Sequence, residues 1–147
     1  MRRVIIVIAT ALLTSACDFS SAQDRNLAQE RACGNQAARI FDKEWGALKE
    51  MLKEMLSVAW ESHYNSNLNR CLIFITYMSP ATKDIPDHYR SGVVVDADSR
   101  LILAEYYGRY PLKENDLPMC VLNDKGFMCR TFDEFKELVT AHFGFDR

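Results

Sequence analysis

Hydrophobic residues recur at helical spacing in the first third of the chain. From Asp24 to Trp45, apolar positions follow one another at intervals of about three and four residues, with charged residues between them. After Gly46 a second run keeps the same spacing, and we expect its methionine-rich stripe to face the core. The pattern predicts two N-terminal helices, the second carrying Leu48, Met51, Leu52, Met55, Leu56, Ala59 and Trp60 on one face.

The middle of the chain has the pattern of strands. CLIFITY (71–77) is apolar almost throughout and rich in β-branched and aromatic residues, so we predict a central strand covered on both faces. SGVVVDA (91–97) and LILAEYY (101–107) predict two further strands joined by a polar turn. MCVLNDKGFMC (119–129) predicts a last hairpin, with Gly126 in the left-handed position of its turn.

A final helix follows this hairpin. Thr131 and Glu134 have the spacing of a capping box, and Gly144 can end the helix. The predicted class is therefore α+β, with N-terminal helices, a small antiparallel sheet of three to four strands and a C-terminal helix. The residues expected on the apolar face of the last helix are Phe132, Phe135, Leu138, Val139, His142 and Phe143.

The first 22 residues resemble an export signal. A pair of arginines precedes the apolar run 4–13, which is too short to cross a bilayer because a spanning helix takes about 20 residues. Small residues then allow cleavage after Ala22, which leaves 23–147 as a single domain with two disulfides. Alternatively, Cys17 is lipidated, although Thr14 stands where a lipoprotein signal normally has Leu. We expect a periplasmic or secreted bacterial protein, with a membrane-anchored lipoprotein as the alternative.

The number of cysteines agrees with export. Either processing route removes or modifies Cys17, and four cysteines remain in an oxidising compartment, where two disulfides are expected. Four cysteines allow three connectivities. We favour Cys33–Cys71 with Cys120–Cys129, because this pairing closes the shortest loops and one of them is a hairpin.

Charge and spacing argue against several functions. The chain has 18 Lys and Arg against 20 Asp and Glu, a net charge of −2, and it becomes more negative after processing, so nucleic-acid binding is not expected. Asp84, Asp87 and His88 lie close together in a loop and could suggest a metal site, but with His63 far away in the sequence the signal is weak. The stretch starting at Asp96 resembles the start of a calcium loop, but it lacks the later ligand and the glycine. We predict no cofactor, no metal ligands and no catalytic residues.

The segment SHYNSNLNRC (62–71) groups the residues that most resemble a site. Cys71 with His63 as base would make a nucleophilic pair, but a disulfide-bonded Cys71 has no free thiolate. Asn and Ser favour turns, since their side chains bond nearby backbone groups. We therefore interpret the segment as a structural clasp, and its candidate functional residues are His63, Tyr64, Asn65 and Asn69.

The same segment carries a resemblance. The string His63-Tyr64-Asn65-x-x-Leu68-Asn69-x-Cys71, followed by an apolar strand, resembles a motif of small exported bacterial proteins of unassigned function. The resemblance extends more loosely to the cysteine-flanked hairpin and the final helix, and it does not include the N-terminal helices. It implies a location in the cell envelope and no particular activity.

Three functional classes follow. The first, which we favour, is a non-enzymatic protein that binds another envelope protein and touches the membrane only through a lipid at Cys17. The second is a carrier or sensor of a small ligand. The third is a hydrolase that uses His63 or His88 with a nearby aspartate, Asp84 or Asp87. The carrier would line an apolar pocket with Tyr77, Tyr106, Tyr107 and Tyr110.

Overall fold

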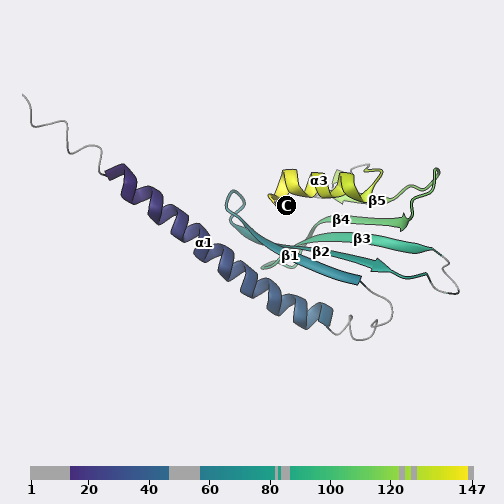
Figure 1. The fold of residues 1–147 in the computed structure, drawn as a ribbon, viewed down its shortest axis with the longest axis horizontal. Coiled ribbons are helices and arrows are strands. Elements are labelled where there is room, and N and C mark those ends of the chain that lie inside the picture. Colours follow the sequence, from purple (N-terminus) through teal and green to yellow (C-terminus); the bar gives the residue numbers. More distant parts are fainter. Residues whose placement is uncertain are drawn as a thin grey trace, which may run out of the picture.

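A β-sheet lies between two helices, one on each face. The computed structural model describes residues 14–46, 57–81, 83, 87–122, 125–126 and 129–145. Helix α1 (Thr14–Ile40) lies diagonally across one face and continues into a short π-helical turn, η1 (Phe41–Trp45), and helix α3 (Phe132–Phe143) covers the other face (Figure 1). No described helix is long and apolar enough to span a membrane.

The sheet is an antiparallel meander in which each strand pairs with the next one along the chain. Consecutive strands are adjacent, which is the usual arrangement in antiparallel sheets. The strands are β1 (Ser57–Asn65), β2 (Arg70–Ser79), β3 (His88–Asp96), β4 (Ile102–Tyr110), β5 (Met119–Leu122) and the two-residue β6 (Lys125–Gly126).

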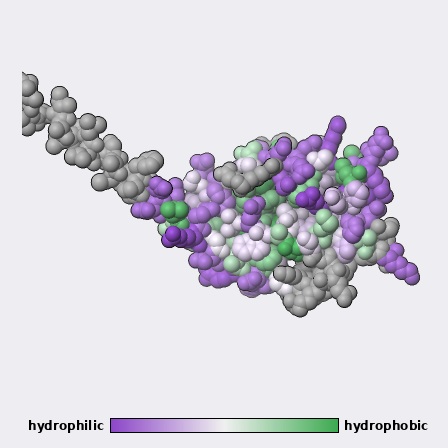
Figure 2. All heavy atoms as spheres, viewed as in Figure 1, coloured by the Kyte–Doolittle hydropathy of each residue, from purple (hydrophilic) through white to green (hydrophobic). Residues whose placement is uncertain are grey.

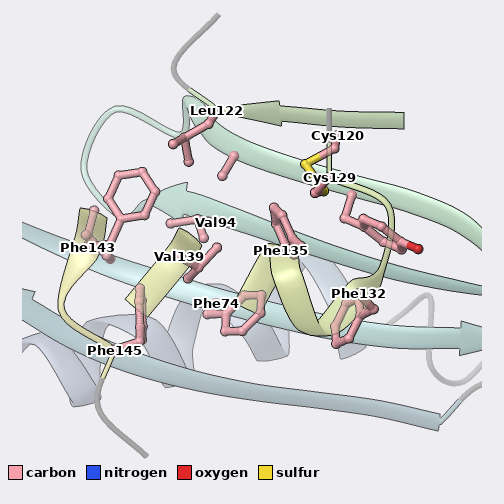
Figure 3. Packing of buried hydrophobic residues seen from close by; sticks show 13 residues of the cluster. Phe74, Val94, Cys120, Leu122, Cys129, Phe132, Phe135, Val139, Phe143 and Phe145 are labelled. Atoms are coloured by element: carbon pink, nitrogen blue, oxygen red, sulfur yellow. A yellow bond between two sulfur atoms is a disulfide. The ribbon is translucent and has the colours of Figure 1, made fainter. Parts of the chain in front are cut away.

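Strand β2 contributes to two separate hydrophobic cores. Side chains alternate between the faces of a strand, so Leu72 and Phe74 join the cluster beneath α3, while Ile73 and Ile75 join the cluster beneath α1. This explains why β2 is apolar at nearly every position, as the sequence predicted for a strand covered on both faces. Figure 3 shows the α3 side, where Phe74 and Val94 of the sheet meet Phe132, Phe135, Val139, Phe143 and Phe145.

Helix α3 packs closely against the sheet at Gly92. A Cβ atom at this position would lie 2.8 Å from the Phe135 ring and 2.9 Å from the Phe132 ring. The absence of a side chain therefore allows two aromatic rings to rest on the backbone of β3. Thr131 caps the helix as predicted, because its hydroxyl accepts a hydrogen bond from the N–H of Glu134. The Glu134 carboxylate accepts its return bond from the N–H of Arg130 and not of Thr131, so the capping box is shifted by one residue on this side. Gly144 ends the helix with a φ of 77°.

The α+β class, one N-terminal helix and the C-terminal helix are confirmed, but three predictions are wrong. The sheet has five strands and the two-residue β6, where the sequence predicted three to four. Residues 57–60 belong to strand β1 and not to a second helix, and the rest of the expected stripe lies outside the described residues. Val58 and Trp60 both pack toward α1, so side chains two residues apart share a face, as they do in a strand. His142 is exposed and does not share the buried face of α3.

Candidate functional site

Two disulfides hold the domain together. Cys33 of α1 is bonded to Cys71 of β2, and Cys120 of β5 is bonded to Cys129 before α3. This is the pairing favoured from the sequence, and it leaves Cys71 without the thiolate that a nucleophile needs. Disulfides persist in oxidising surroundings, so they indicate a location outside the cytoplasm.

The segment 62–71 forms the end of β1, a turn and the start of β2. Asn65 is buried, and its amide joins two parts of the fold. Its Oδ1 accepts a hydrogen bond of 2.9 Å from the N–H of Leu68 in the turn, and its Nδ2 donates one of 2.9 Å to the carbonyl of Phe143 at the end of α3. Asn65 therefore connects the first hairpin with the last helix.

Tyr64 and Asn69 close the turn on the opposite face of β1. Asn69 has a φ of 52°, in the left-handed region that asparagine tolerates better than most residues. Its Oδ1 accepts the hydroxyl hydrogen of Tyr64, and that hydroxyl oxygen accepts a hydrogen bond of 3.0 Å from Gln29 Nε2 of α1. Beside these groups an open polar groove of about 510 Å³ lies between α1 and the turn, lined by Arg25, Asn26, Ala28, Gln29, Tyr64, Ser66 and Asn69.

Glu30 of α1 completes this arrangement, and the sequence did not single it out. One carboxylate oxygen accepts a 2.6 Å hydrogen bond from the backbone N–H of Tyr64, and the other lies 3.2 Å from His63 Nδ1. On its other side the His63 ring meets the edge of Phe145, with 5.8 Å between the ring centroids. The one sequence signal for Glu30 is its position one turn before Cys33, on the side of the helix that the disulfide holds against the sheet.

The hydrolase candidates do not assemble into a site. His63 pairs with Leu72 at one end of the sheet. His88 lies at the other end, next to Tyr89, which pairs with Ser79. His88 Nδ1 accepts a hydrogen bond from the N–H of Ala81, and Asp87 binds Lys113 and Arg109. Asp84 lies outside the described residues, and within the described part of the chain no group of three metal-ligating side chains forms.

The four tyrosines proposed for a ligand pocket do not line a common cavity. Tyr106 is 2% exposed in the core beneath α3, and burial raises the pKa of its hydroxyl. Tyr107, the next residue along the strand, points to the opposite face of the sheet, where its ring stacks on Tyr89 with centroids 4.9 Å apart. Alternation along β4 therefore separates these two side chains.

The calcium-like stretch is a hairpin turn between β3 and β4, as the sequence predicted. Asp96 Oδ1 accepts hydrogen bonds of 2.9 and 3.1 Å from the N–H groups of Asp98 and Ser99, and its Oδ2 pairs with Arg70 at 2.9 Å. Burial alone would raise the pKa of Asp96. The two N–H groups and the Arg70 guanidinium outweigh this effect, and the pKa lies below its ordinary value.

An exposed apolar surface lies where β4 and β5 meet. We call it the tyrosine–leucine surface and define it as Tyr89, Tyr107, Leu117 and Met119. Leu117 is 91% exposed, and Tyr107 and Met119 are 42% and 45% exposed. With Gly108, Arg109, Asp116 and Pro118, these four residues line a shallow depression of about 270 Å³. Figure 2 shows that hydrophobic residues lie exposed among hydrophilic ones on one face of the domain.

The loop that carries Leu117 is held by ion pairs. Arg109 of β4 lies 3.5 Å from Asp87 and 3.7 Å from Asp116, and Lys113 reaches Asp87 at 3.2 Å. Asp116 Oδ2 also accepts a 2.8 Å hydrogen bond from the backbone N–H of Lys113. The loop before β5 is therefore fixed to β3 and β4, and it presents Leu117 to solvent from a defined position.

Comparison with known proteins gives no relative: no family model, no curated protein and no solved structure matches this chain. The site must therefore be interpreted from its own residues.

Proposed function

We propose that this chain is an exported protein of the bacterial cell envelope that binds another envelope protein and catalyses no reaction. The observation that carries this proposal is Leu117, a large apolar side chain that is almost fully exposed on a loop held by Arg109 and Asp116. An exposed leucine costs solvation free energy, which a binding partner would recover.

The composition of the surface around Leu117 supports a protein partner. Aromatic residues, methionine and arginine are enriched at the centres of protein interfaces, and Tyr107, Met119 and Arg109 are of these types. The ion pairs of the loop reduce the conformational entropy that binding would otherwise cost.

Two features support the proposed location. The disulfides require an oxidising compartment, and the N-terminal 22 residues have the pattern of an export signal. N-terminal sequencing of the protein from a bacterial host tests this directly. A mature chain that begins near Gln23, or one that is blocked by lipid at Cys17, supports export, whereas a chain that retains Met1 contradicts it.

Capture from an envelope extract tests the binding function, with three baits compared. We expect the wild-type protein to retain a specific partner that Leu117→Asp loses. Leu101→Asp is the matched control, because Leu101 is also an exposed leucine, at 61%, and lies just before β4, away from the loop that carries Leu117. Loss with Leu117→Asp alone supports the proposed surface. An identical set of captured proteins for all three baits contradicts it.

A further inference from the structure

Arg90 differs in its surroundings from three other arginines of the strands and their turns. Arg70, Arg100 and Arg109 each pair with a carboxylate, at distances between 2.9 and 3.7 Å. Arg90 of β3 has no carboxylate partner among the described residues. Its guanidinium lies 4.0 Å above the Phe132 ring and 6.0 Å from the Tyr110 ring. The stacking holds the cation in place and leaves its N–H donors available in the plane of the group.

Arg90 lines a cleft of about 270 Å³ between the sheet and the first turns of α3. Phe74 and Phe132 supply aromatic walls, and Thr76 of β2 adds a hydroxyl. Lys136 of α3 brings a second cation, which pairs with Asp133 at 3.0 Å on the exposed side of the helix. The residues that line the cleft are Ala59, Trp60, Glu61, Phe74, Thr76, Arg90, Phe132 and Lys136.

We propose that this cleft binds the carboxylate or phosphate group of a small ligand that also carries an apolar part. The planar guanidinium of Arg90 matches the two oxygens of such a group, and Lys136 adds a positive charge. The apolar part would pack on Phe74 and Phe132. A cleft of this volume holds roughly nine water-sized groups, so the ligand is a small molecule or a single residue of a larger one.

The charges within the cleft determine the orientation of the bound ligand. Glu61 of β1 lines the cleft together with Ala59, at the wall formed by the first strand, whereas Arg90 comes from the third strand. A carboxylate at the β1 wall disfavours an anion there, so the anionic group is bound at the Arg90 side. Asp133 reduces the contribution of Lys136, and Arg90 is therefore the main determinant of binding.

This site is independent of the tyrosine–leucine surface. Arg90 contacts Phe132 of α3, so it lies on the face of the sheet that α3 covers, while Tyr107 lies on the opposite face. The two proposals can therefore be tested separately. Leu117→Asp should abolish binding of the protein partner, and a change at Arg90 should abolish binding of the anion.

Titration of the intact, disulfide-bonded protein followed by NMR tests the proposal with four probes. Benzoate and phenyl phosphate combine an anion with an apolar ring, inorganic phosphate is the bare anion, and benzamide is the neutral isostere of benzoate. We expect saturable shifts at Thr76 and Arg90 with benzoate or phenyl phosphate, and binding of benzamide at least roughly tenfold weaker. Whichever of benzoate and phenyl phosphate binds more tightly shows whether the cleft prefers a carboxylate or a phosphate group.

Variants assign the binding to the cleft. Arg90→Gln should lower the affinity for the anion at least roughly tenfold, because it removes the charge-assisted hydrogen bonds. Arg130→Gln is the matched control, an exposed arginine outside the cleft, and should leave binding unchanged. If Arg90→Gln does not fold, Lys136→Met is used as the cleft variant in its place. It should lower the affinity for the anion by a smaller factor. Equal binding of benzoate and benzamide, no saturation with either anion, or unchanged affinity in the cleft variant overturns the proposal.

Discussion

The carboxylate of Glu30 in α1 accepts a hydrogen bond of 2.6 Å from the backbone N–H of Tyr64 in β1. Strand β1 is the first strand of the sheet, so no strand of the described residues neighbours one side of its backbone. An unpaired strand edge invites pairing with other chains, and a carboxylate placed on it prevents this locally. Glu30 thus fixes the position of α1 and covers one N–H group of the edge.

Replacement of Glu30 tests this role. Glu30→Ala leaves the N–H of Tyr64 without an acceptor and removes the partner of His63 Nδ1, so we expect the free energy of unfolding to fall by about 1–3 kcal/mol. Urea unfolding measures the change. Glu114→Ala, at an exposed loop position, should have little effect. Equal stability of the two variants would show that water replaces the carboxylate without cost.

The clasp interpretation of residues 62–71 predicts a thermal effect. Asn65→Ala, Asn69→Ala and Tyr64→Ala should each lower the melting temperature, because each removes hydrogen bonds that join the hairpin to α1 or α3. Asn67→Ala is the control, since Asn67 is exposed in the same turn.

Position 69 allows a finer distinction. Its φ of 52° suits glycine, so Asn69→Gly should be less destabilising than Asn69→Ala, although both lose the acceptor for the Tyr64 hydroxyl. Unchanged or raised melting temperatures for all the contact variants would contradict the clasp and favour a functional role for His63.

Asp96 should make stability depend on pH. Its pKa is lowered in the folded state, so the stabilisation is complete above the unfolded pKa of about 3.9 and is lost as the pH falls through the lower folded value. We expect Asp96→Asn to reduce the free energy of unfolding by about 1–3 kcal/mol at pH 7. The difference from the wild type should shrink below about pH 4. Asp42→Asn, at an exposed site, is the control and should leave the free energy of unfolding at pH 7 nearly unchanged.

Two glycines should respond in opposite directions to the same substitution. Gly92→Ala places a methyl group against the Phe135 and Phe132 rings and should destabilise the fold by about 1–3 kcal/mol. Gly46→Ala meets nothing within 4 Å and has helical dihedrals, so it should be neutral or stabilising. Calorimetry of the two variants measures both effects, and a neutral Gly92→Ala would mean that α3 can move away from the sheet at little cost.

The two disulfides should contribute unequally. The chain-entropy model gives about 4 kcal/mol for Cys33–Cys71, with a separation of 38 residues, and about 2.5 kcal/mol for Cys120–Cys129, with a separation of 9. Urea unfolding of the two double-alanine variants measures which disulfide contributes more to the free energy of unfolding. Peptide mapping without reduction should find no free thiol among the four cysteines. A larger loss for the shorter loop would indicate that packing around Cys120 matters more than chain entropy.

Local patterns predicted the elements whose sequence signal is strong. Strand β2, the turn at Asp96 and the capped start of α3 each follow from a few neighbouring residues. Strand β1 was missed because Ala59 and Trp60 fit a helical spacing as well as alternation. His63, on its other face, was included in the polar segment 62–71 that was interpreted as a turn.

The residues that define the candidate sites depend on tertiary placement. Glu30 matters because α1 crosses β1 at that point, and no pattern within the helix specifies the crossing. Arg90 stands out because no carboxylate in the described part of the chain reaches it, which a count of charges does not disclose. Leu117 was part of an ordinary loop in the sequence, and its exposure follows from the ion pairs that hold the loop around it.

The bond between Cys33 and Cys71 also determines how the domain responds to mechanical force. The amino-terminal half of α1 extends beyond the sheet, and residues 23–29 are exposed (Figure 1). Tension applied to this half of the helix passes through a covalent bond into β2, which supports both cores. Residues 34–70 are therefore shielded from extension under load. Reduction of this one bond would release roughly 120–130 Å of additional chain.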